Sequence, residues 1–322
     1  MSRTRFVRGD IVEVRSPAEI AATLDSDGRL DGIPFMPEMT GKCGHRFRVH
    51  RRAERTCVEG LGMRRLNNTV FLEDLRCDGA AHDGCQRGCL FFWKEAWLKP
   101  VAAQNGTTGP TAVANIDTVA TLNGRLITRS GVRYVCQSTA LATATSPLTI
   151  WSQFLLLREI ADGELPPTRF IAIVVLAFLN KVRALAGLPA LGALQGLKIR
   201  APKGSLKLAP GERVYVKSEA EIAATLDPRG RNSGLSFEPD MASFVGKPFE
   251  VEAPVTRIIQ EQTGRMTELT STVTLKGVSC TGLCSKNCPR NNPIYWREIW
   301  LERKEDASTV EPAVLPAPAT AA

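Results

Sequence analysis

The chain has 322 residues, 43% hydrophobic and 23% charged, which is long enough for two or three domains with separate cores. The first residues, MSRTRFVRGDIVEV, carry charges where an export signal needs an apolar segment, so we expect a cytoplasmic protein. In a reducing compartment the nine cysteines are expected to be thiols available for metal ligation rather than disulfides. A net charge of +8 is by itself weak support for an anionic partner.

The chain begins with an alternating strand at residues 11–14, IVEV. Ser16 and Glu19 then form a capping-box pattern, with Pro17 at the first helical position, which predicts a short helix. The stretches HRFRVHR and NTVFLEDL read as further strands. Several short strands with one small helix predict a compact, mostly antiparallel, β-barrel-like domain, for which an SH3-like shape is our closest guess.

Most of the positive charge is local, because residues 42–65 hold eight Lys/Arg against two Glu. We expect part of this stretch to contact an acidic protein or a phosphate-bearing ligand. Nucleic acid is disfavoured, because the corresponding later stretch, 244–267, has no excess of positive charge and aromatic side chains are sparse around the arginines. The predicted partner-binding residues are Arg46, Arg48, Arg51, Arg52 and Arg55.

A cysteine-rich loop follows at residues 77–97, CDGAAHDGCQRGCLFFWKEAW. Four thiolates suit a tetrahedral Zn²⁺ ion or an iron–sulfur cluster, and we prefer zinc over the cluster. The tryptophans of this segment are expected to pack over the loop as core. The candidate ligands in this part of the chain are Cys57, Cys77, Cys85 and Cys89, with Cys43 and His82 nearby.

The middle of the chain is predicted to hold a strand pair and a helical hairpin. Residues 118–135 read as two strands joined by the turn Asn123-Gly124. One helix is expected to start at Ser146-Pro147 and a second to cover residues 170–186. The apolar run FIAIVVLAFL is too short to span a membrane, which takes ~20 residues. We expect a buried helix there, with peripheral membrane contact as the alternative.

The chain contains an internal repeat. The segment GDIVEVRSPAEIAATLD at residues 9–25 returns as GERVYVKSEAEIAATLD at 211–227, a spacing of 202 residues. At a spacing of 203, Cys77 and Cys85 match Cys280 and Cys288, and WKEAWL matches WREIWL. We therefore predict an α+β protein in which two repeated domains flank the middle region. The predicted boundaries are 5–100, 113–197 and 207–304, followed by a disordered tail at 305–322.

The second copy offers three candidate ligands of its own, Cys280, Cys284 and Cys288. It lacks a fourth, because Cys57 aligns with Ile259. Cys136 of the middle region is the remaining cysteine that could complete the second set. Since Cys136 precedes a helix start, a nucleophilic thiolate is the alternative role for it.

Two segments, LEDLRCDGAAHDGCQRGCLFFWKEAWL and CPRNNPIYWREIWLE, resemble uncharacterised tandem-domain proteins of bacteria. The resemblance covers both copies and part of the middle region. It implies a duplicated domain and a bacterial source, and it carries no activity, cofactor or catalytic residue to this chain.

The sequence has no P-loop, dinucleotide fingerprint, hydrolase elbow, zinc-protease helix or kinase motif. Our first hypothesis is a metal-stabilised binding, scaffold or accessory protein that contacts an acidic or phosphate-bearing partner. The second is an iron–sulfur or thiol-dependent redox component that works where the second copy meets Cys136. The third is a nucleic-acid-binding protein. Whether the chain is an enzyme stays open.

Overall fold

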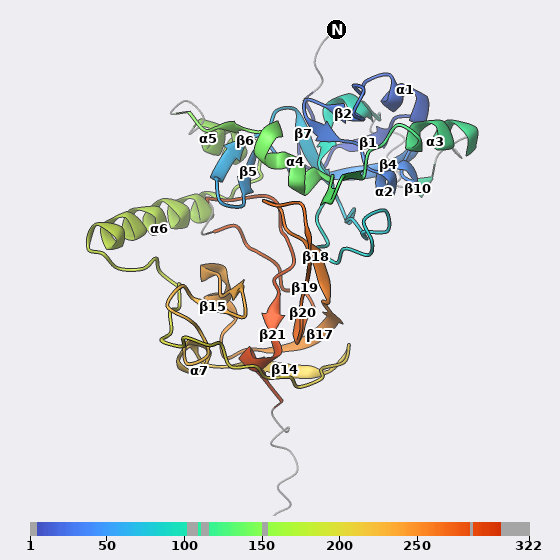
Figure 1. Cartoon of the computed structure of the whole chain (residues 1–322). Coiled ribbons are helices and arrows are strands. Elements are labelled where there is room, and N and C mark those ends of the chain that lie inside the picture. The colour runs from blue at the N-terminus through green and yellow to red at the C-terminus, as the bar shows by residue number, and fades with distance from the viewer. Residues whose placement is uncertain (1–4, 102–108, 111–115, 150–153, 284–285, 304–322) are drawn as a thin grey trace, which may run out of the picture.

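The protein is a mixed α+β protein with several small antiparallel sheets (Figure 1). The computed structural model describes residues 5–101, 109–110, 116–149, 154–283 and 286–303. Within these ranges no helix has the length and apolar character needed to cross a membrane. The predicted disordered tail, residues 305–322, lies outside the described residues.

The main sheet of the N-terminal half has the strand order β8-β7-β4-β1-β9, and β10 also pairs with β4. All its pairs are antiparallel, with Val12 opposite Phe47. The strands predicted near residues 11, 45 and 69 are confirmed. Their bounds are β1 Ile11–Val14, β4 His45–Arg52, β7 Thr69–Leu72, β8 Trp93–Lys94, β9 Leu98–Pro100 and β10 Gly109–Pro110.

The main sheet of the C-terminal half has the corresponding strand order, β21-β20-β17-β14-β22. Val214 lies opposite Phe249, which is the pair found in the first sheet 202 residues earlier. None of the described sheets closes into a barrel, so the predicted barrel shape is not confirmed. The bounds are β14 Arg213–Val216, β17 Pro248–Pro254, β20 Thr272–Leu275, β21 Trp296–Arg297 and β22 Leu301–Glu302.

Small strand pairs surround the two main sheets. Two of them, β5–β6 and β18–β19, are hairpins that reach toward the opposite half of the molecule (Figure 1). The bounds are β2 Arg29–Leu30, β3 Ile33–Pro34, β5 Arg55–Val58, β6 Gly62–Arg65, β11 Arg129–Ser130, β12 Arg133–Tyr134, β13 Ser146–Pro147, β15 Arg231–Asn232, β16 Leu235–Ser236, β18 Arg257–Ile259 and β19 Met266–Glu268.

The predicted capping boxes are confirmed at the start of α1 and α7. Ser16 N–H donates to Glu19 Oε2 at 3.0 Å, and Glu19 N–H donates to Ser16 Oγ at 3.4 Å. Ser218 and Glu221 make the same two bonds at the same distances. These bonds satisfy backbone donors that the first helical turn leaves without partners. The short helices are α1 Pro17–Ala21, α2 Pro37–Thr40, α7 Glu219–Ala223 and the 3₁₀ turns η1 Glu95–Trp97, η4 Pro239–Phe244 and η5 Glu298–Trp300.

The middle region differs from its prediction in three places. The second predicted strand is itself a hairpin, because β11 and β12 pair with each other. Residues 118–123 belong to helix α3, Ile116–Asn123, so the first predicted strand is wrong. The β-branched residues there favour a strand, but Leu122 is buried in the N-terminal core, and tertiary packing outweighs propensity. Ser146-Pro147 forms strand β13 against β6 instead of starting a helix. The helices are α4 Gln137–Ala144, α5 Phe154–Ala161 and α6 Pro167–Leu185.

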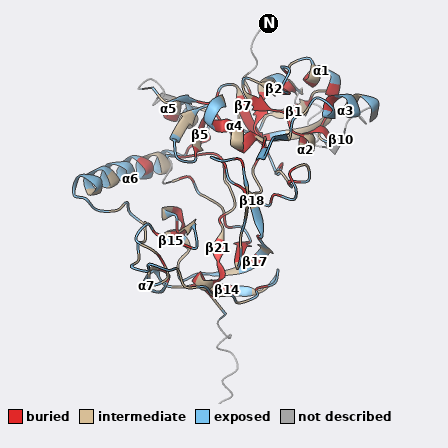
Figure 2. Ribbon diagram, viewed as in Figure 1, coloured by how far each residue is buried: buried red, intermediate tan, exposed pale blue. Residues whose placement is uncertain are grey.

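Helix α6 confirms the predicted second helix but not its predicted burial. Ile173 packs against Leu156 and Leu165, and it is the buried side chain of the helix. Phe170 packs partly buried beside Ile173, but Ile171, Phe178 and most of the other large apolar residues of the helix are exposed. Figure 2 shows α6 mostly in the colour of exposed residues. The apolar run is therefore a surface feature of the described structure, because the short helix α5 covers only one side of it.

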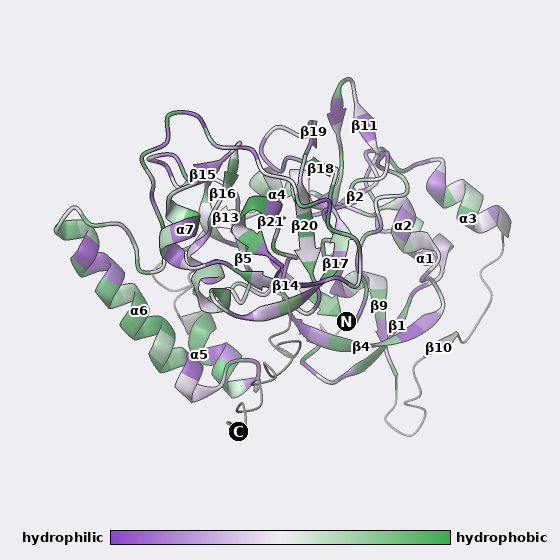
Figure 3. Ribbon diagram, turned by 90° about the horizontal axis from the view of Figure 1, so that it is seen from below, coloured by the Kyte–Doolittle hydropathy of each residue, from purple (hydrophilic) through white to green (hydrophobic). Residues whose placement is uncertain are grey.

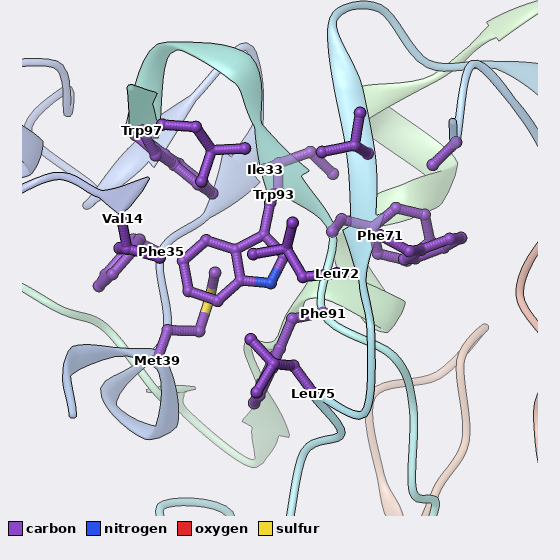
Figure 4. Packing of buried hydrophobic residues seen from close by; sticks show 14 of the residues in the cluster. Val14, Ile33, Phe35, Met39, Phe71, Leu72, Leu75, Phe91, Trp93 and Trp97 are labelled. Atoms are coloured by element: carbon purple, nitrogen blue, oxygen red, sulfur yellow. The ribbon is translucent and has the colours of Figure 1, made fainter. Parts of the chain in front are cut away.

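Each half has its own core of buried side chains. Trp93 and Trp97 are fully buried and meet Phe35 in edge-to-face contacts (Figure 4). Trp296 and Trp300 do the same around Phe237. The prediction that the tryptophans form core is confirmed. The first core therefore holds the strand that directly follows the cysteine loop.

Candidate metal centre

The first cysteine loop folds back on itself between its two ends. Arg76 and Leu90 form an antiparallel bridge, and Cys77 N–H donates to the Cys89 carbonyl at 2.8 Å. Gly79 has φ +71°, and a Cβ at this position would lie 2.1 Å from the Cys85 carbonyl oxygen. Only glycine allows this approach of the backbone. As a result three cysteines that are spread over thirteen positions of the sequence face one cavity.

The cavity has a fourth thiol, that of Cys136, which enters from the residue before α4. Gln137 holds this segment against the loop, because its Nε2 donates to the Phe92 carbonyl at 2.9 Å and its Oε1 accepts from Phe92 N–H at 2.8 Å. Apolar side chains form most of the remaining wall. The lining thiols are Cys77, Cys85, Cys89 and Cys136, and the apolar lining includes Met36, Leu90, Phe91, Phe92 and Ile259.

His82 lines the cavity but is not available as a ligand. Its Nδ1 lies 2.6 Å from Glu38 Oε1 and its Nε2 lies 3.0 Å from the Val135 carbonyl oxygen, so both ring nitrogens donate. Burial lowers the pKa of His82, but the hydrogen bond and charge of Glu38 outweigh burial and raise the pKa overall. His82 therefore ties the loop to Glu38 and to Val135, the residue before Cys136, through its two ring nitrogens.

Burial raises the pKa of three thiols around this cavity. The pKa of Cys136 is raised to about 11, and those of Cys77 and Cys85 are raised as well, in each case mainly by desolvation. At neutral pH these groups are protonated thiols in the protein alone. This state opposes a nucleophilic role for Cys136, which would need a lowered pKa.

A second group of cysteines lies in the C-terminal half. Cys288 Sγ is 3.0 Å from Cys57 Sγ and accepts the backbone N–H of Cys57 at 3.2 Å. Cys280 Sγ lies 3.4 Å from Asp240 Oδ2, as Cys77 Sγ lies 3.8 Å from Glu38 Oε1 in the first half. Cys284 lies outside the described residues, and its predicted role stays a prediction.

The grouping of the cysteines is the reverse of the predicted one. The sequence interpretation placed Cys57 with the first loop and offered Cys136 to the second, whereas Cys136 joins the first loop and Cys57 meets Cys288 of the second. Among the residues that the structure describes, no three His, Cys, Asp or Glu side chains are grouped so that they could hold a metal ion. A site for a single zinc ion is therefore not found in that part of the chain.

A buried charge network lies between the two cysteine groups. Arg290 donates to Glu261 Oε2 at 2.7 Å, to Ser138 Oγ at 2.9 Å and to the Cys57 carbonyl at 3.0 Å. Arg87 lies 3.3 Å from the same Glu261 oxygen. Burial raises the pKa of Glu261, but the two guanidinium groups, Arg290 first, lower it overall. The network joins the N-terminal half, α4 and the C-terminal half at one carboxylate.

The sequence interpretation missed the carboxylates that hold the loops. Glu38 accepts Ala81 N–H at 3.2 Å, and Asp240 accepts Gly282 N–H at 3.0 Å. A signal for both was present, because Glu38 and Asp240 match at the repeat spacing of 202 and are both acidic.

The five arginines predicted to bind a partner are engaged within the chain. Arg52 and Arg55 are 5% and 2% exposed, and they pair with carboxylates at 2.6 Å and 3.2 Å. Arg51 is turned toward the C-terminal half, where it reaches the Asn287 carbonyl. Among the described residues, their acidic partners include Glu13 for Arg46, Glu73 for Arg48, Glu159 for Arg51 and Arg55, and Glu54 and Glu95 for Arg52.

Comparisons with protein-family models, with curated proteins and with solved structures found no match to this chain.

Proposed function

We propose that the protein binds an iron–sulfur cluster through Cys77, Cys85, Cys89 and Cys136 and serves as an electron-transfer component. The observation that carries this proposal is the convergence of these four thiols on one cavity. Four cysteine thiolates form the usual ligand set of such clusters. Because four thiolates can occupy all four corners of a [4Fe–4S] cluster, the set favours electron transfer over substrate binding at iron.

The surroundings of the thiols also suit a cluster. The backbone N–H of Ile259 points to Cys85 Sγ at 3.3 Å, and hydrogen bonds of this kind tune the reduction potential. Arg87 and Arg290 lie within electrostatic reach of Cys89 and offset the negative charge that thiolates and a cluster would bring. The apolar wall restricts access of water, which also affects the potential.

A cluster fits the arrangement better than one zinc ion. A single ion needs its thiolates drawn together at about 2.3 Å from one centre, and the described side chains are not grouped in that way. A cluster spreads its thiolates over several iron atoms. The cavity that the thiols line measures about 30 Å³, so it would have to widen when a cluster is assembled.

Anaerobic reconstitution with iron and sulfide tests the proposal. The wild-type protein is expected to turn brown, with absorbance near ~400 nm and bound sulfide equal to bound iron. Cys136→Ala is expected to lose the iron of this site. Because assembly deprotonates the buried thiols, iron uptake is also expected to increase as the pH rises from about 6 to 8.5.

Cys43→Ala is the matched control, because Cys43 is a buried thiol of the first core that does not line the cavity. Circular dichroism of both variants separates loss of the site from loss of folding, and Cys89→Ala gives a second test on the opposite wall. Cluster content equal to the wild type in both Cys136→Ala and Cys89→Ala would contradict the proposal.

The duplicated-domain interpretation is part of the same proposal. The equal strand orders, the equal capping boxes and the 3₁₀ turns η1 and η5 at matching places support two copies of one small fold, for which we retain the SH3-like description. In this interpretation each copy supplies a cysteine loop and a hairpin that reaches the other copy.

A second candidate function, peripheral binding to an anionic lipid surface, is favoured by α6. Phe178 and Leu185 of this helix are 65% and 83% exposed, and Ile199 further on is 98% exposed. Figure 3 shows long hydrophobic stretches of α6 with hydrophilic ones between them. Residues 165–211 contain seven Lys/Arg and no Asp or Glu. Exposed apolar side chains beside basic ones are typical of segments that lie in the headgroup region of a bilayer.

Vesicle flotation tests this second candidate. The protein is expected to float with phosphatidylglycerol vesicles and not with purely zwitterionic ones. A double change, Phe178→Ser with Leu185→Ser, is expected to weaken binding by at least about tenfold, because each large apolar side chain contributes about 1.5 kcal/mol or more when buried. Val132→Ser, at an exposed valine far along the chain from α6, is the control. Equal binding by the double variant and the control would contradict a role for α6.

A further inference from the structure

The geometry points to a redox-modification site where the two halves meet, at which Cys57 and Cys288 form a reversible disulfide when a peroxide oxidises them. Cys57 lies on strand β5 of the N-terminal half, and Cys288 lies on the cysteine loop of the C-terminal half. The disulfide is a covalent clasp between the halves. It needs neither a metal nor the cluster proposed above, so it goes beyond the proposed function and is tested separately from it.

The two thiols are in direct contact. Cys57 Sγ lies 3.0 Å from Cys288 Sγ, and the backbone N–H of Cys57 donates to the same Cys288 sulfur at 3.2 Å. A disulfide bond is ~2.05 Å long, so the two sulfurs need to approach each other by only about 1 Å. Cys57 is half-buried and Cys288 is buried. The pair is therefore reached from the side of Cys57 by an oxidant as small as hydrogen peroxide.

Hydrogen bonds on both sides of the thiols hold strand β5 against the loop. Arg290 donates to the Cys57 carbonyl at 3.0 Å, and Arg55 donates to the Lys286 carbonyl at 3.1 Å. Arg55 and Cys57 belong to the same strand, and Lys286 and Arg290 each lie two positions from Cys288. These bonds keep the two sulfurs facing each other although they are 231 positions apart in the chain.

The other cysteine loop receives the same hairpin contact without a facing thiol. The backbone N–H of Ile259, from hairpin β18–β19, donates to Cys85 Sγ at 3.3 Å. Ile259 matches Cys57 at the repeat spacing of 202, and Cys288 matches Cys85 at 203. Both halves thus direct a hairpin N–H at a loop sulfur, but the hairpin side chain is isoleucine in one case and cysteine in the other. The repeated packing therefore does not by itself require a cysteine at position 57.

The protonation of the pair suits oxidation. The hydrogen bond from Cys57 is the largest effect on Cys288, and together with Arg290 it outweighs burial and lowers the pKa of Cys288 to about 6. The same hydrogen bond and burial raise the pKa of Cys57, which therefore keeps its proton. At neutral pH Cys288 is a thiolate, which is the nucleophilic form of cysteine. At the matching Cys85, burial raises the pKa instead.

The reaction with hydrogen peroxide takes two steps. The Cys288 thiolate attacks one peroxide oxygen, the O–O bond breaks, hydroxide leaves, and the sulfur becomes a sulfenic acid. The Cys57 thiol then attacks this sulfur, the S–O bond breaks, and the hydroxyl group leaves as water with the proton of Cys57. Two electrons pass from the two sulfurs to the peroxide. Two molecules of a thiol such as glutathione reverse the change and are themselves joined in a disulfide.

Limited oxidation of the full-length protein tests the inference. The reduced protein is treated at pH 7 with hydrogen peroxide, the remaining thiols are blocked with N-ethylmaleimide, and an unreduced digest is analysed by mass spectrometry. We expect a peptide pair that joins Cys57 to Cys288, a loss of two of the nine thiols, and recovery of both with dithiothreitol. Cys77, Cys85 and Cys136 are expected to react more slowly, because their pKa values are raised.

Three variants and an unfolding measurement complete the test. Cys57→Ser and Cys288→Ser are each expected to abolish the linked peptides, whereas Cys43→Ala, which removes a buried thiol of the first core, is expected to keep them. The linked wild type is expected to unfold at a higher denaturant concentration than the reduced protein, because a cross-link between distant positions restricts the unfolded chain. Peroxide is expected to cause no such shift in Cys57→Ser.

The decisive measurements are made on the wild type, so they do not depend on the folding of a variant. Full labelling of Cys57 and Cys288 by N-ethylmaleimide after peroxide treatment would overturn the inference, and so would linkage of either residue to a different cysteine. An unchanged unfolding midpoint in the linked protein would overturn the clasp between the halves.

Discussion

Replacing Glu261 by alanine is expected to lower the free energy of unfolding by about 3–5 kcal/mol. The side chains of Glu261 and Arg290 are 2% and 5% exposed, and their closest charged atoms are 2.7 Å apart. Without Glu261, the Arg290 guanidinium stays buried with only neutral acceptors, Ser138 and the Cys57 carbonyl. An uncompensated buried charge is among the most costly results of a single substitution.

Chemical unfolding of three variants measures this effect. Glu261→Gln keeps the shape of the side chain and one acceptor oxygen. We therefore expect it to lower the free energy of unfolding by less than Glu261→Ala does. Glu250→Ala removes a pair with Lys276 whose side chains are 49% and 68% exposed, and it should cost less than about 1 kcal/mol. If Glu261→Ala costs no more than Glu250→Ala, the junction is not held by this network.

The change Glu38→Gln is expected to lower the free energy of unfolding by about 2–3 kcal/mol. The size of this loss is expected to depend on pH. The pKa of His82 is raised in the folded protein, so its contribution is complete below its unfolded value of about 6.5 and is lost as the pH rises through the folded value. Burial raises the pKa of Glu38 but the His82 hydrogen bond lowers it overall, so the contribution of Glu38 is lost as the pH falls through its lowered value. The cost of Glu38→Gln should therefore be greatest between about pH 5 and 6.5.

Unfolding measured from pH 4 to 9 checks this profile. Asp240→Asn is the matched control, because Asp240 accepts Thr281 Oγ and Gly282 N–H at the corresponding place. The sequence has serine at 285, where the repeat spacing of 203 matches His82. The stability cost of Asp240→Asn should therefore not decrease as the pH rises above about 6.5. A cost of Glu38→Gln that does not change with pH would show that His82 is neutral in the folded protein.

Some features were predictable because they depend on neighbours in the sequence. The capping boxes at Ser16 and Ser218 involve residues three apart, and the structure has both. The first strand of each copy follows from alternation of apolar and polar residues. The burial of the tryptophans was predictable as well, because large aromatic side chains are on average highly buried in folded proteins.

Other features were not predictable from local pattern. The β-branched residues of α3 favour a strand, and only packing of Leu122 in the first core favours the helix. The apolar run of α6 has the composition of a buried helix, but its exposure depends on how much of it α5 covers.

The sequence by itself determined the internal repeat, the helix caps at Ser16 and Ser218, the first strand of each half and the set of candidate cysteine ligands. Only the tertiary structure decided which cysteines lie together. Cys57 meets Cys288 across 231 positions of the chain, and Ile259 meets Cys85 across 174. Contacts at such separations are set by the packing of two hairpins against opposite halves, and no pattern of nearby residues encodes that packing.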